Sequence, residues 1–384
     1  MPSTIPSMTQ PFDICIRGDG IAGRTLALLL ARERLHVGLV TGTPVAPKND
    51  LPVAGDVRAY ALNAKSRTLL ESLRCWPEAQ YATEVLQMQV KGDDGGEVNF
   101  SAAELQVQGL TWIVDVPVLE AQLADAVRFQ PQIELLVAPE PATLTVICEG
   151  KTSRTRSEFG IDFEVTPYSQ TAIAARLTCE IPHGQTARQW FSQGEILAFL
   201  PLDGPQGNSV AIVWSVLKER VPDLMQTSPE EFCLQLTEAS QGCLGKLSLI
   251  SERGAWPLQK AQVARWVGLH EGKAWAVAGD AAHNMHPLAG QGLNLGLSDV
   301  ASLATTLRER EYWRSVGDEK LLRRYERSRN TELLAMGTAM DGLQQLFSRD
   351  NTVLQAARNW GMNGFERSGP IKQWLARQAM GFTN

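Results

Sequence analysis

The sequence predicts an α/β fold in which a Rossmann-like nucleotide-binding domain is assembled from separate parts of the chain. A strand, a glycine-rich turn and a helix follow one another at 12–35, and the same succession recurs at 274–307. Between them, 168–217 carries β-branched and aromatic residues with partial alternation and Gly or Pro turns, which predicts an antiparallel sheet. Leucines and methionines at helical spacing after residue 318 predict C-terminal helices.

The first glycine-rich segment follows the strand predicted at 12–17. Gly18, Gly20 and Gly23 form the pattern G-x-G-x-x-G where this strand joins a helix. In dinucleotide sites the first glycine allows a tight turn, the second lets a pyrophosphate approach the backbone, and the third lets the helix pack on the strand. An acidic ribose ligand is usual about 20 residues later, and Thr41 stands there. The segment predicts a dinucleotide site without that ligand.

The second segment places an acidic residue and a glycine-rich turn ahead of a helix. An apolar run at 274–278 stops at Gly279 and Asp280, whose carboxylate can accept hydrogen bonds from a hydroxylated ligand. The free N–H groups and the dipole of the helix that follows favour negative charge. Pro287 limits the loop, and Gly290 and Gly292 let a planar ligand touch the backbone. The helix begins near Leu293 and Asn294. Taken alone, the segment fits a plain strand-to-helix connection equally well.

Composition and charge narrow the class of protein. The chain has 384 residues, 44% hydrophobic and 20% charged, enough for two domains with buried cores. The formal net charge of -6 argues against a nucleic acid partner, because phosphate binding needs a basic surface. Six cysteines without a C-x-x-C pair suit free thiols in a reducing cytoplasm. We expect no signal peptide at 1–10 and no membrane-spanning run. The sequence indicates no particular oligomeric state.

Metal and hydrolase chemistry are not indicated. His283 and His286 lie three residues apart, but Pro287 follows directly and no third ligand is near, so no metal site is expected. The pattern Gly-x-Ser-x-Gly of serine hydrolases is absent. His283 is instead a candidate for orienting the neighbouring loop or relaying a proton.

Two further segments complete a set of four ordered motifs. Arg58 lies in the segment 56–63, and 149–156 has the sequence Glu-Gly-Lys-Thr-Ser-Arg-Thr-Arg. With the two glycine-rich segments, they make the sequence resemble the FAD-dependent aromatic-ring monooxygenases, most closely the ubiquinone-biosynthesis hydroxylase family. That family has an arginine facing the FAD pyrophosphate, a motif Asp-Gly-x-x-Ser-x-x-Arg, and a Gly-Asp motif similar to 279–299. The resemblance covers nearly the whole chain.

The resemblance implies a discontinuous FAD-binding domain and a substrate domain. The expected limits are 10–80, 108–160 and 265–345 for the FAD-binding domain, 81–107 and 161–264 for the substrate domain, and 346–384 for a C-terminal helical region. The expected FAD contacts are Gly18, Gly20, Gly23, Arg58, Glu149, Arg156, Gly279, Asp280, Pro287, Gly290, Gly292, Leu293 and Asn294.

The implied reaction is aromatic hydroxylation. NAD(P)H reduces FAD, and the reduced flavin reacts with O2 to give a C4a-hydroperoxyflavin that transfers one oxygen atom to an electron-rich ring. The expected substrate is a polyprenylphenol precursor of ubiquinone. Asp280 would hold the ribityl chain, and His283 and Pro287 would act beside the isoalloxazine ring. Glu149 and Arg156 are candidates for contact with both FAD and NAD(P)H.

Departures from the family pattern keep a second hypothesis open. Thr41 stands at the place of the ribose ligand, Glu149 replaces an aspartate, and only 137–142 links two strand-like runs where a longer excursion is usual. A non-catalytic protein of this fold, a partner in a biosynthetic complex with weak or no FAD turnover, would tolerate these changes. A third hypothesis, a nicotinamide dehydrogenase using only the N-terminal glycines, leaves 279–299 unexplained.

The end of the chain bears on location. An apolar face beside basic residues would suit a membrane surface that holds polyprenyl substrates, although a short, weakly basic helix docks more often on its own core. The residues concerned are Ile371, Trp374, Leu375 and Met380 with Lys372 and Arg377. The expected location is the cytoplasm, with peripheral contact with the inner membrane left open.

Overall fold

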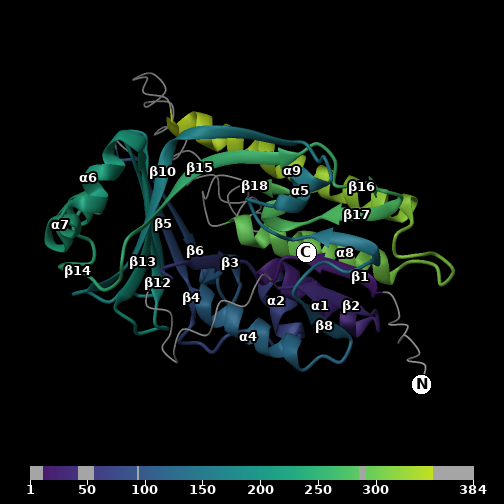
Figure 1. The fold of residues 1–384 in the computed structure, drawn as a ribbon. Coiled ribbons are helices and arrows are strands. Elements are labelled where there is room, and N and C mark those ends of the chain that lie inside the picture. The colour runs from purple at the N-terminus through teal and green to yellow at the C-terminus, as the bar shows by residue number, and fades with distance from the viewer. Residues whose placement is uncertain (1–11, 42–55, 93–94, 285–290, 349–384) are drawn as a thin grey trace, which may run out of the picture.

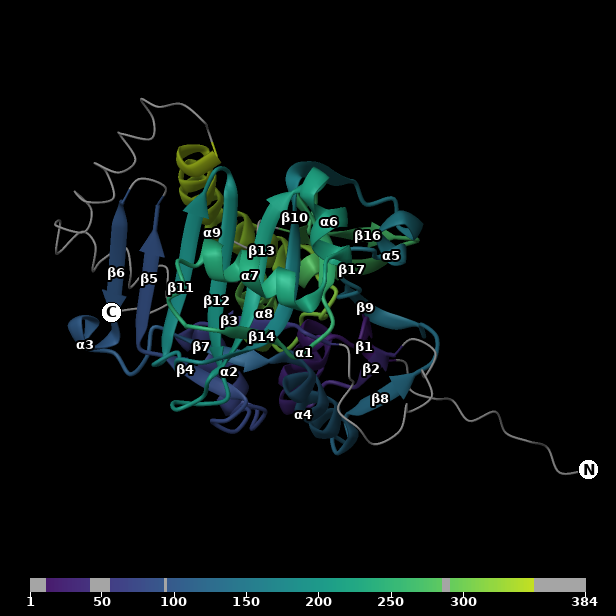
Figure 2. The ribbon, with the colours of Figure 1, turned by 90° about the vertical axis from the view of Figure 1, so that its left-hand side faces the viewer.

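The computed structural model describes residues 12–41, 56–92, 95–284 and 291–348. Within these ranges the strands form three sheets, of six, nine and three strands. Figure 1 shows the nine-stranded sheet at one end of the molecule and the six-stranded sheet with its helices at the other, and Figure 2 shows the same arrangement from the side. The predicted contacts Pro287 and Gly290, His286, and the terminal segment 349–384 lie outside the described residues.

The six-stranded sheet has the order β16-β17-β9-β1-β2-β8. All neighbouring strands are parallel except β16 and β17. The strands are β1 (Phe12–Arg17), β2 (Val37–Val40), β8 (Ile133–Leu136), β9 (Ala142–Ile147), β16 (Val267–His270) and β17 (Lys273–Val277). Strands far apart in the chain therefore pair directly, which confirms the α/β fold with a discontinuous Rossmann-like domain.

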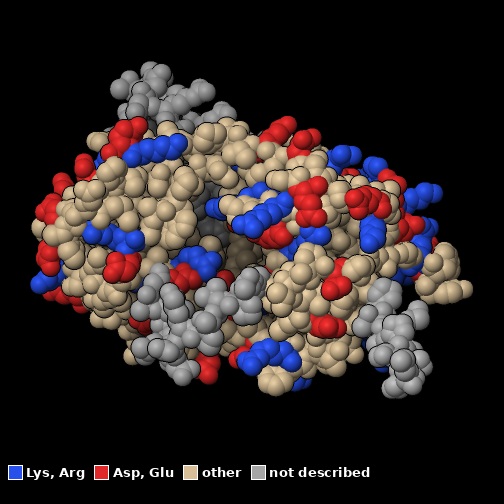
Figure 3. Space-filling model, viewed as in Figure 1, with Lys and Arg blue, Asp and Glu red and all other residues tan. Residues whose placement is uncertain are grey.

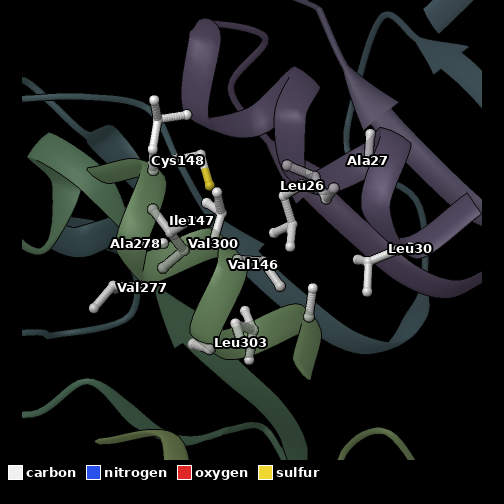
Figure 4. Close-up of a cluster of buried hydrophobic side chains, with 14 of the residues drawn as sticks. Leu26, Ala27, Leu30, Val146, Ile147, Cys148, Val277, Ala278, Val300 and Leu303 are labelled. Carbon is white, nitrogen blue, oxygen red and sulfur yellow. The ribbon is translucent and has the colours of Figure 1, made fainter. Parts of the chain in front are cut away.

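Helices bury this sheet because its central strands are apolar on both faces. The helices are α1 (Ile21–Arg32), α2 (Ala64–Ser72), α4 (Val116–Arg128), α5 (Arg154–Glu158), α8 (Gln291–Arg308) and α9 (Glu319–Ser348). Figure 4 shows side chains of α1, β9, β17 and α8 packed together, with Cys148 directly after β9. This core holds the two predicted glycine-rich segments next to each other.

The nine-stranded sheet has the order β18-β15-β10-β13-β12-β11-β5-β6, with β14 paired to β10. The strands are β5 (Gln87–Lys91), β6 (Glu97–Ser101), β10 (Phe163–Cys179), β11 (Thr186–Ser192), β12 (Glu195–Leu202), β13 (Ser209–Leu217), β14 (Leu247–Leu249), β15 (Gly254–Val263) and β18 (His283–Asn284). Most pairs are antiparallel, as expected, and β11 with β5 is parallel. The run 187–202 is a hairpin that turns at Gln193 and Gly194, both with positive φ.

Short helices cover one face of this large sheet. They are α6 (Val221–Gln226) and α7 (Pro229–Ala239), with the 3-10 turn η1 (Lys218–Arg220) before them and α3 (Ala102–Leu105) beside β6. Odd-numbered residues of β10, including Ile173 and Ala175, pack against α6 and α7. The even-numbered residues of β10 therefore lie on the opposite face, because side chains alternate along a strand.

A small third sheet lies between the two large ones. It pairs β3 (Ala59–Leu62), β7 (Thr111–Asp115) and β4 (Ala82–Val85), and it was not expected from the sequence. It packs through Ala59 and Ile113 against Ala211 of the large sheet. The expected domain limits would assign β4 to the substrate domain and β7 to the other. Those limits remain a proposal.

Candidate active site

The first motif forms a tight turn between β1 and α1. Gly18 has φ 112°, and a Cβ there would lie 2.5 Å from the carbonyl oxygen of Cys148. A Cβ at Gly23 would lie 1.9 Å from the carbonyl oxygen of Gly18. Both positions need glycine, and the turn thereby brings the start of α1 close to β1 and the end of β9.

Gly20 faces open space, in contrast to its two companions. A Cβ there would meet no atom of the protein within 4 Å, and the residue is exposed. Gly20 is the N-cap of α1, and within this described segment no side chain caps the helix and no acidic residue lies in its first turn. The free N–H groups and the helix dipole therefore point at uncovered space, which fits an anionic group such as a pyrophosphate.

Arg58 reaches the same region through acidic neighbours. Its Nε and Nη2 atoms lie 2.9 Å and 2.6 Å from the carboxylate oxygens of Asp56, and Nη2 lies 3.3 Å from Glu120 Oε1. Arg24, in the first turn of α1, donates to the Glu120 carbonyl oxygen. The hydrogen bonds to Asp56 raise the pKa of Arg58, so its positive charge is retained. The structure thus brings Arg58 close to the glycine turn.

Glu149 anchors its own loop. Its carboxylate accepts hydrogen bonds from the Ser153 hydroxyl at 2.6 Å and from the amide and hydroxyl of Thr155 at 3.0 and 2.7 Å. Burial alone would raise the pKa of Glu149, but these bonds and the charge of Arg17 outweigh it and lower the pKa. The extra methylene relative to an aspartate is therefore accommodated without loss of a partner.

Arg156 joins this loop to the last motif. Its Nη1 donates to the Ala281 carbonyl oxygen at 2.7 Å, and the guanidinium also donates to the carbonyl groups of Gly150 and Lys151. The guanidinium carbon lies 3.6 Å from the centre of the Phe163 ring, and burial lowers the pKa of the group. The side chain is thus bonded to the protein's own carbonyl oxygens.

The last motif begins with a turn at 279–282 that continues β17 and includes the 3-10 turn η2 (Gly279–Ala281). Gly279 has φ 67°, and a Cβ there would lie 3.3 Å from the Ala22 Cβ on α1. A Cβ at Gly296 would lie 3.3 Å from the Gly279 Cα, so α8 lies directly against the turn. Gly279 is therefore held between α1 and α8, and the partly buried Asp280 follows it in the turn.

The start of α8 has open space beside one residue, Gly292, and a hydrogen-bonded side chain at another, Asn294. A Cβ at Gly292 would meet no atom of the protein within 4 Å, and Leu293 is partly buried. Asn294 is 5% exposed; its Nδ2 donates to the Ala61 carbonyl oxygen at 2.8 Å, and its Oδ1 accepts from the Ser66 hydroxyl at 2.7 Å. Asn294 thus fastens α8 to β3 and α2.

A buried ionic network, not expected from the sequence, lies behind the 279–282 turn. Asp299 Oδ2 lies 2.7 Å from His283 Nε2 and accepts from the Gly279 amide at 2.8 Å, and Asp299 Oδ1 accepts from Arg329 Nε at 2.7 Å. Asp299 and Arg329 are fully buried. The sequence held one signal for it: an acidic residue on the apolar face of the helix predicted after 293 needs a buried partner.

The face of the large sheet opposite α6 and α7 carries small side chains. Ala174 of β10 pairs with Val213 of β13, which pairs with Ala198 of β12. In the next row on this face lies Ser215, which is 3% exposed. Figure 3 shows the surface hollowed between the large-sheet side and the parallel-sheet side, with Lys and Arg side chains at the rim.

Comparison with known proteins gives the class. The family model described as "FAD binding domain" matches residues 141–336. The structure of PqsL from Pseudomonas aeruginosa, titled a probable FAD-dependent monooxygenase, superposes with a TM-score of 0.70 at 20% identity, over 92% of this chain and all of that one. The p-nitrophenol 4-monooxygenase PnpA from Pseudomonas putida superposes with a TM-score of 0.71 at 16% identity, over 96% of each chain. Fold, motifs and match define a flavoprotein with FAD as its cofactor.

Relatives narrow the class to a family. The ubiquinone hydroxylase UbiL of Rhodospirillum rubrum is 30% identical over 98% of this chain and 93% of its own length. The 3-demethoxyubiquinol 3-hydroxylase of Escherichia coli is 29% identical over 97% of this chain and 99% of its own. The chain belongs to the ubiquinone-biosynthesis hydroxylase family of FAD-dependent monooxygenases, which confirms the resemblance. In the described part of the chain, no helix is both long and apolar enough to cross a membrane.

Proposed function

We propose that the protein uses NAD(P)H and O2 to insert one oxygen atom into the electron-rich ring of a polyprenylphenol precursor of ubiquinone. The observation that carries this proposal is the meeting of the open Gly20 turn with the 279–282 turn, which lie on α1 and at the end of the parallel sheet. The names of the two ubiquinone hydroxylase relatives support the substrate class.

The proposed cofactor contacts follow from charge and open space. FAD, when bound, would accept a hydride and activate O2. The amide groups at the start of α1, with Arg58, neutralise a pyrophosphate, and Asp280 accepts hydrogen bonds from the hydroxylated chain. The start of α8 at Gly292 favours the negative charge of a reduced ring. Arg156 and Glu149 act in this proposal by shaping their loop, since their polar atoms bond within the protein.

Of the two residues proposed to act beside the ring, the structure describes His283. Because its Nε2 bonds to the buried carboxylate of Asp299, we assign to His283 the orienting role in preference to proton relay. Pro287 keeps its proposed role of packing at the ring.

The proposed substrate position is the small-residue face of the large sheet. Ala174, Ala198 and Val213 leave room for a planar ring that larger side chains would fill, and an apolar ring is favoured against them. Ser215 lies one row away on the same face and carries a hydroxyl group. Arg176 lies on the same face and pairs with Asp115 at 2.5 Å. Arg176 also donates to the Arg58 carbonyl oxygen, so it bounds the proposed substrate position on the side of Arg58.

The test combines product analysis with a variant whose larger side chain fills the proposed substrate position. We expect purified protein with FAD, NAD(P)H and O2 to add one oxygen atom to a prenylated phenol, measured by mass spectrometry. Ala198→Phe should abolish product while leaving the FAD dissociation constant unchanged. Leu234→Phe, on the exposed side of α7, is the matched control and should retain full turnover.

The non-catalytic alternative is weakened by the Glu149 loop. The Glu149 carboxylate accepts three hydrogen bonds within this loop, so the residue that replaces the aspartate is engaged in the loop's structure. A protein that neither oxidises NAD(P)H nor hydroxylates any prenylated phenol would contradict the proposed activity and favour that alternative.

A further inference from the structure

The buried pair of Asp299 and Arg329 is unusual in its position. Both side chains are fully buried, and their nearest atoms lie 2.7 Å apart. Burial lowers the pKa of Arg329, but the charges of Asp299 and Glu332 outweigh it and raise the pKa, so the guanidinium is charged. Buried ion pairs add little to stability compared with apolar side chains of the same size. A role other than folding is therefore the more economical explanation for this pair.

The carboxylate of Asp299 gathers donors from three elements. It binds the amide of Gly279 at the end of β17, the ring of His283 in β18, and Arg329 on α9, while Asp299 itself belongs to α8. Oxygens of a carboxylate accept several hydrogen bonds at once, and a charged acceptor strengthens each of them. One side chain thus joins both ends of the 279–282 turn to α8.

Arg329 is in turn fixed from the other side. Its Nη1 donates to the Ser298 hydroxyl at 3.1 Å and to the Glu332 carboxylate, and one turn earlier on α9 the Tyr325 hydroxyl donates to the Val277 carbonyl oxygen at 2.9 Å. The guanidinium therefore has a fixed orientation toward Asp299. Rotation of the Asp299 carboxylate away from Gly279 would break this contact.

We propose that Asp299, oriented by Arg329, is a positioning residue for the flavin: it holds the 279–282 turn so that Asp280 and the start of α8 face the cofactor together. The inference rests on the proposed placement of FAD at these residues. Asp299 touches neither cofactor nor substrate in this assignment and acts through the Gly279 amide and His283. Loss of the carboxylate would leave the turn free to shift by the small distances that weaken a preorganised site.

The decisive variant removes both charges together. Asp299→Leu combined with Arg329→Met leaves no uncompensated charge in the core, so we expect the protein to fold with a melting temperature close to that of the wild type. We expect its FAD dissociation constant, from fluorescence titration of apo-protein, to rise at least about tenfold, the loss typical of missing hydrogen bonds to a charged group. The absorption bands of bound flavin should shift, and kcat should fall more than the KM for the aromatic substrate changes.

Controls separate this inference from the proposed function. Arg323→Gln breaks an exposed ion pair with Glu319 on the same helix and should change none of these quantities. A wild type that binds no FAD would contradict the proposed function and the inference together. A folded double variant with wild-type FAD affinity and spectrum would overturn the inference alone.

If the double variant does not fold, Asp299→Asn tests the positioning role instead, because it keeps the size of the side chain and one acceptor oxygen. Weakened FAD binding in this folded variant supports the positioning role, and wild-type binding overturns it. If neither variant folds, the pair serves folding itself and the inference is wrong.

Discussion

The three glycines of the first motif make different contacts, and substitutions at each should differ accordingly. At Gly20 a side chain meets only open space, so Gly20→Asp should keep the fold and even improve the N-cap of α1. The added charge would face the proposed pyrophosphate and weaken FAD binding by about tenfold or more. Fluorescence titration of the apo-protein with FAD measures this effect.

Two variants calibrate that prediction. Gly20→Asn has the same size and capping ability without the charge, so it should bind FAD better than Gly20→Asp. Gly23→Ala, whose Cβ would lie 1.9 Å from the Gly18 carbonyl oxygen, should instead destabilise the apo-protein by roughly 1–3 kcal/mol. Equal FAD affinity of Gly20→Asp and the wild type would refute the assignment of this turn.

Glu149 should make stability depend on pH. Its pKa is lowered in the folded protein, so its contribution is present above the ordinary value of 4.5 and is lost as the pH falls through the lowered value. We expect Glu149→Gln to be less stable than the wild type near neutral pH and equal to it in strong acid. Urea unfolding at a series of pH values measures the difference, and a difference that does not vary with pH would contradict this.

Single residues were predictable where backbone geometry demands them. Gly18 and Gly23 are required by contacts within one strand-turn-helix unit, which a local pattern encodes. The partner of Asp299 lies 30 residues away on another helix, and no spacing rule selects Arg329 from the other arginines of α9. Asn294 was expected to contact the cofactor. Its hydrogen bonds to Ala61 and Ser66 join residues 233 and 228 positions apart in the chain, and a local sequence pattern does not predict bonds of that range.

At the scale of elements, Asp115 links β7, α4 and the large sheet. Its Oδ1 caps α4 by accepting from the Val118 amide, and its Oδ2 pairs with Arg176 at 2.5 Å. We expect Asp115→Asn, which keeps the cap, to cost about 1 kcal/mol less stability than Asp115→Ala. Denaturant unfolding of both variants gives the comparison.

The ion pair itself is measured by a double-mutant cycle with Arg176→Gln. Because both side chains are mostly buried, at 21% and 15% exposure, a coupling free energy of about 1–2 kcal/mol is expected. Additive effects would show that the pair does not join the elements.

The elements themselves were largely predictable from residue patterns. Apolar runs placed β1 and β17, and alternation placed the antiparallel strands β10, β12 and β13. The three-stranded sheet was missed because β3 pairs with β7 across about fifty residues, as Leu62 with Trp112, and pairing partners at such range depend on tertiary packing. Within the sheet expected at 168–217, the sequence did not single out the hairpin turn at Gln193, because a non-glycine residue adopts positive φ there.

At the scale of the whole molecule, the four motifs meet although the chain leaves and re-enters the parallel sheet between them. The bond from Arg156 to Ala281 and the contact of Gly279 with Ala22 join segments more than a hundred residues apart. The resemblance to the family, which rests on the order of these motifs, predicted that they meet. Composition alone does not predict this meeting. Arg176 of the large sheet pairs with Asp115 of β7 and so joins the large sheet to the three-stranded sheet.

The most direct test is equilibrium titration of the apo-protein with FAD, comparing the wild type with Gly20→Asp at matched stability. We expect saturable binding of one FAD per chain by the wild type and a clear loss of affinity in the variant. A wild-type protein that stays colourless and cannot be reconstituted with FAD would contradict the assignment of the four motifs to one flavin site.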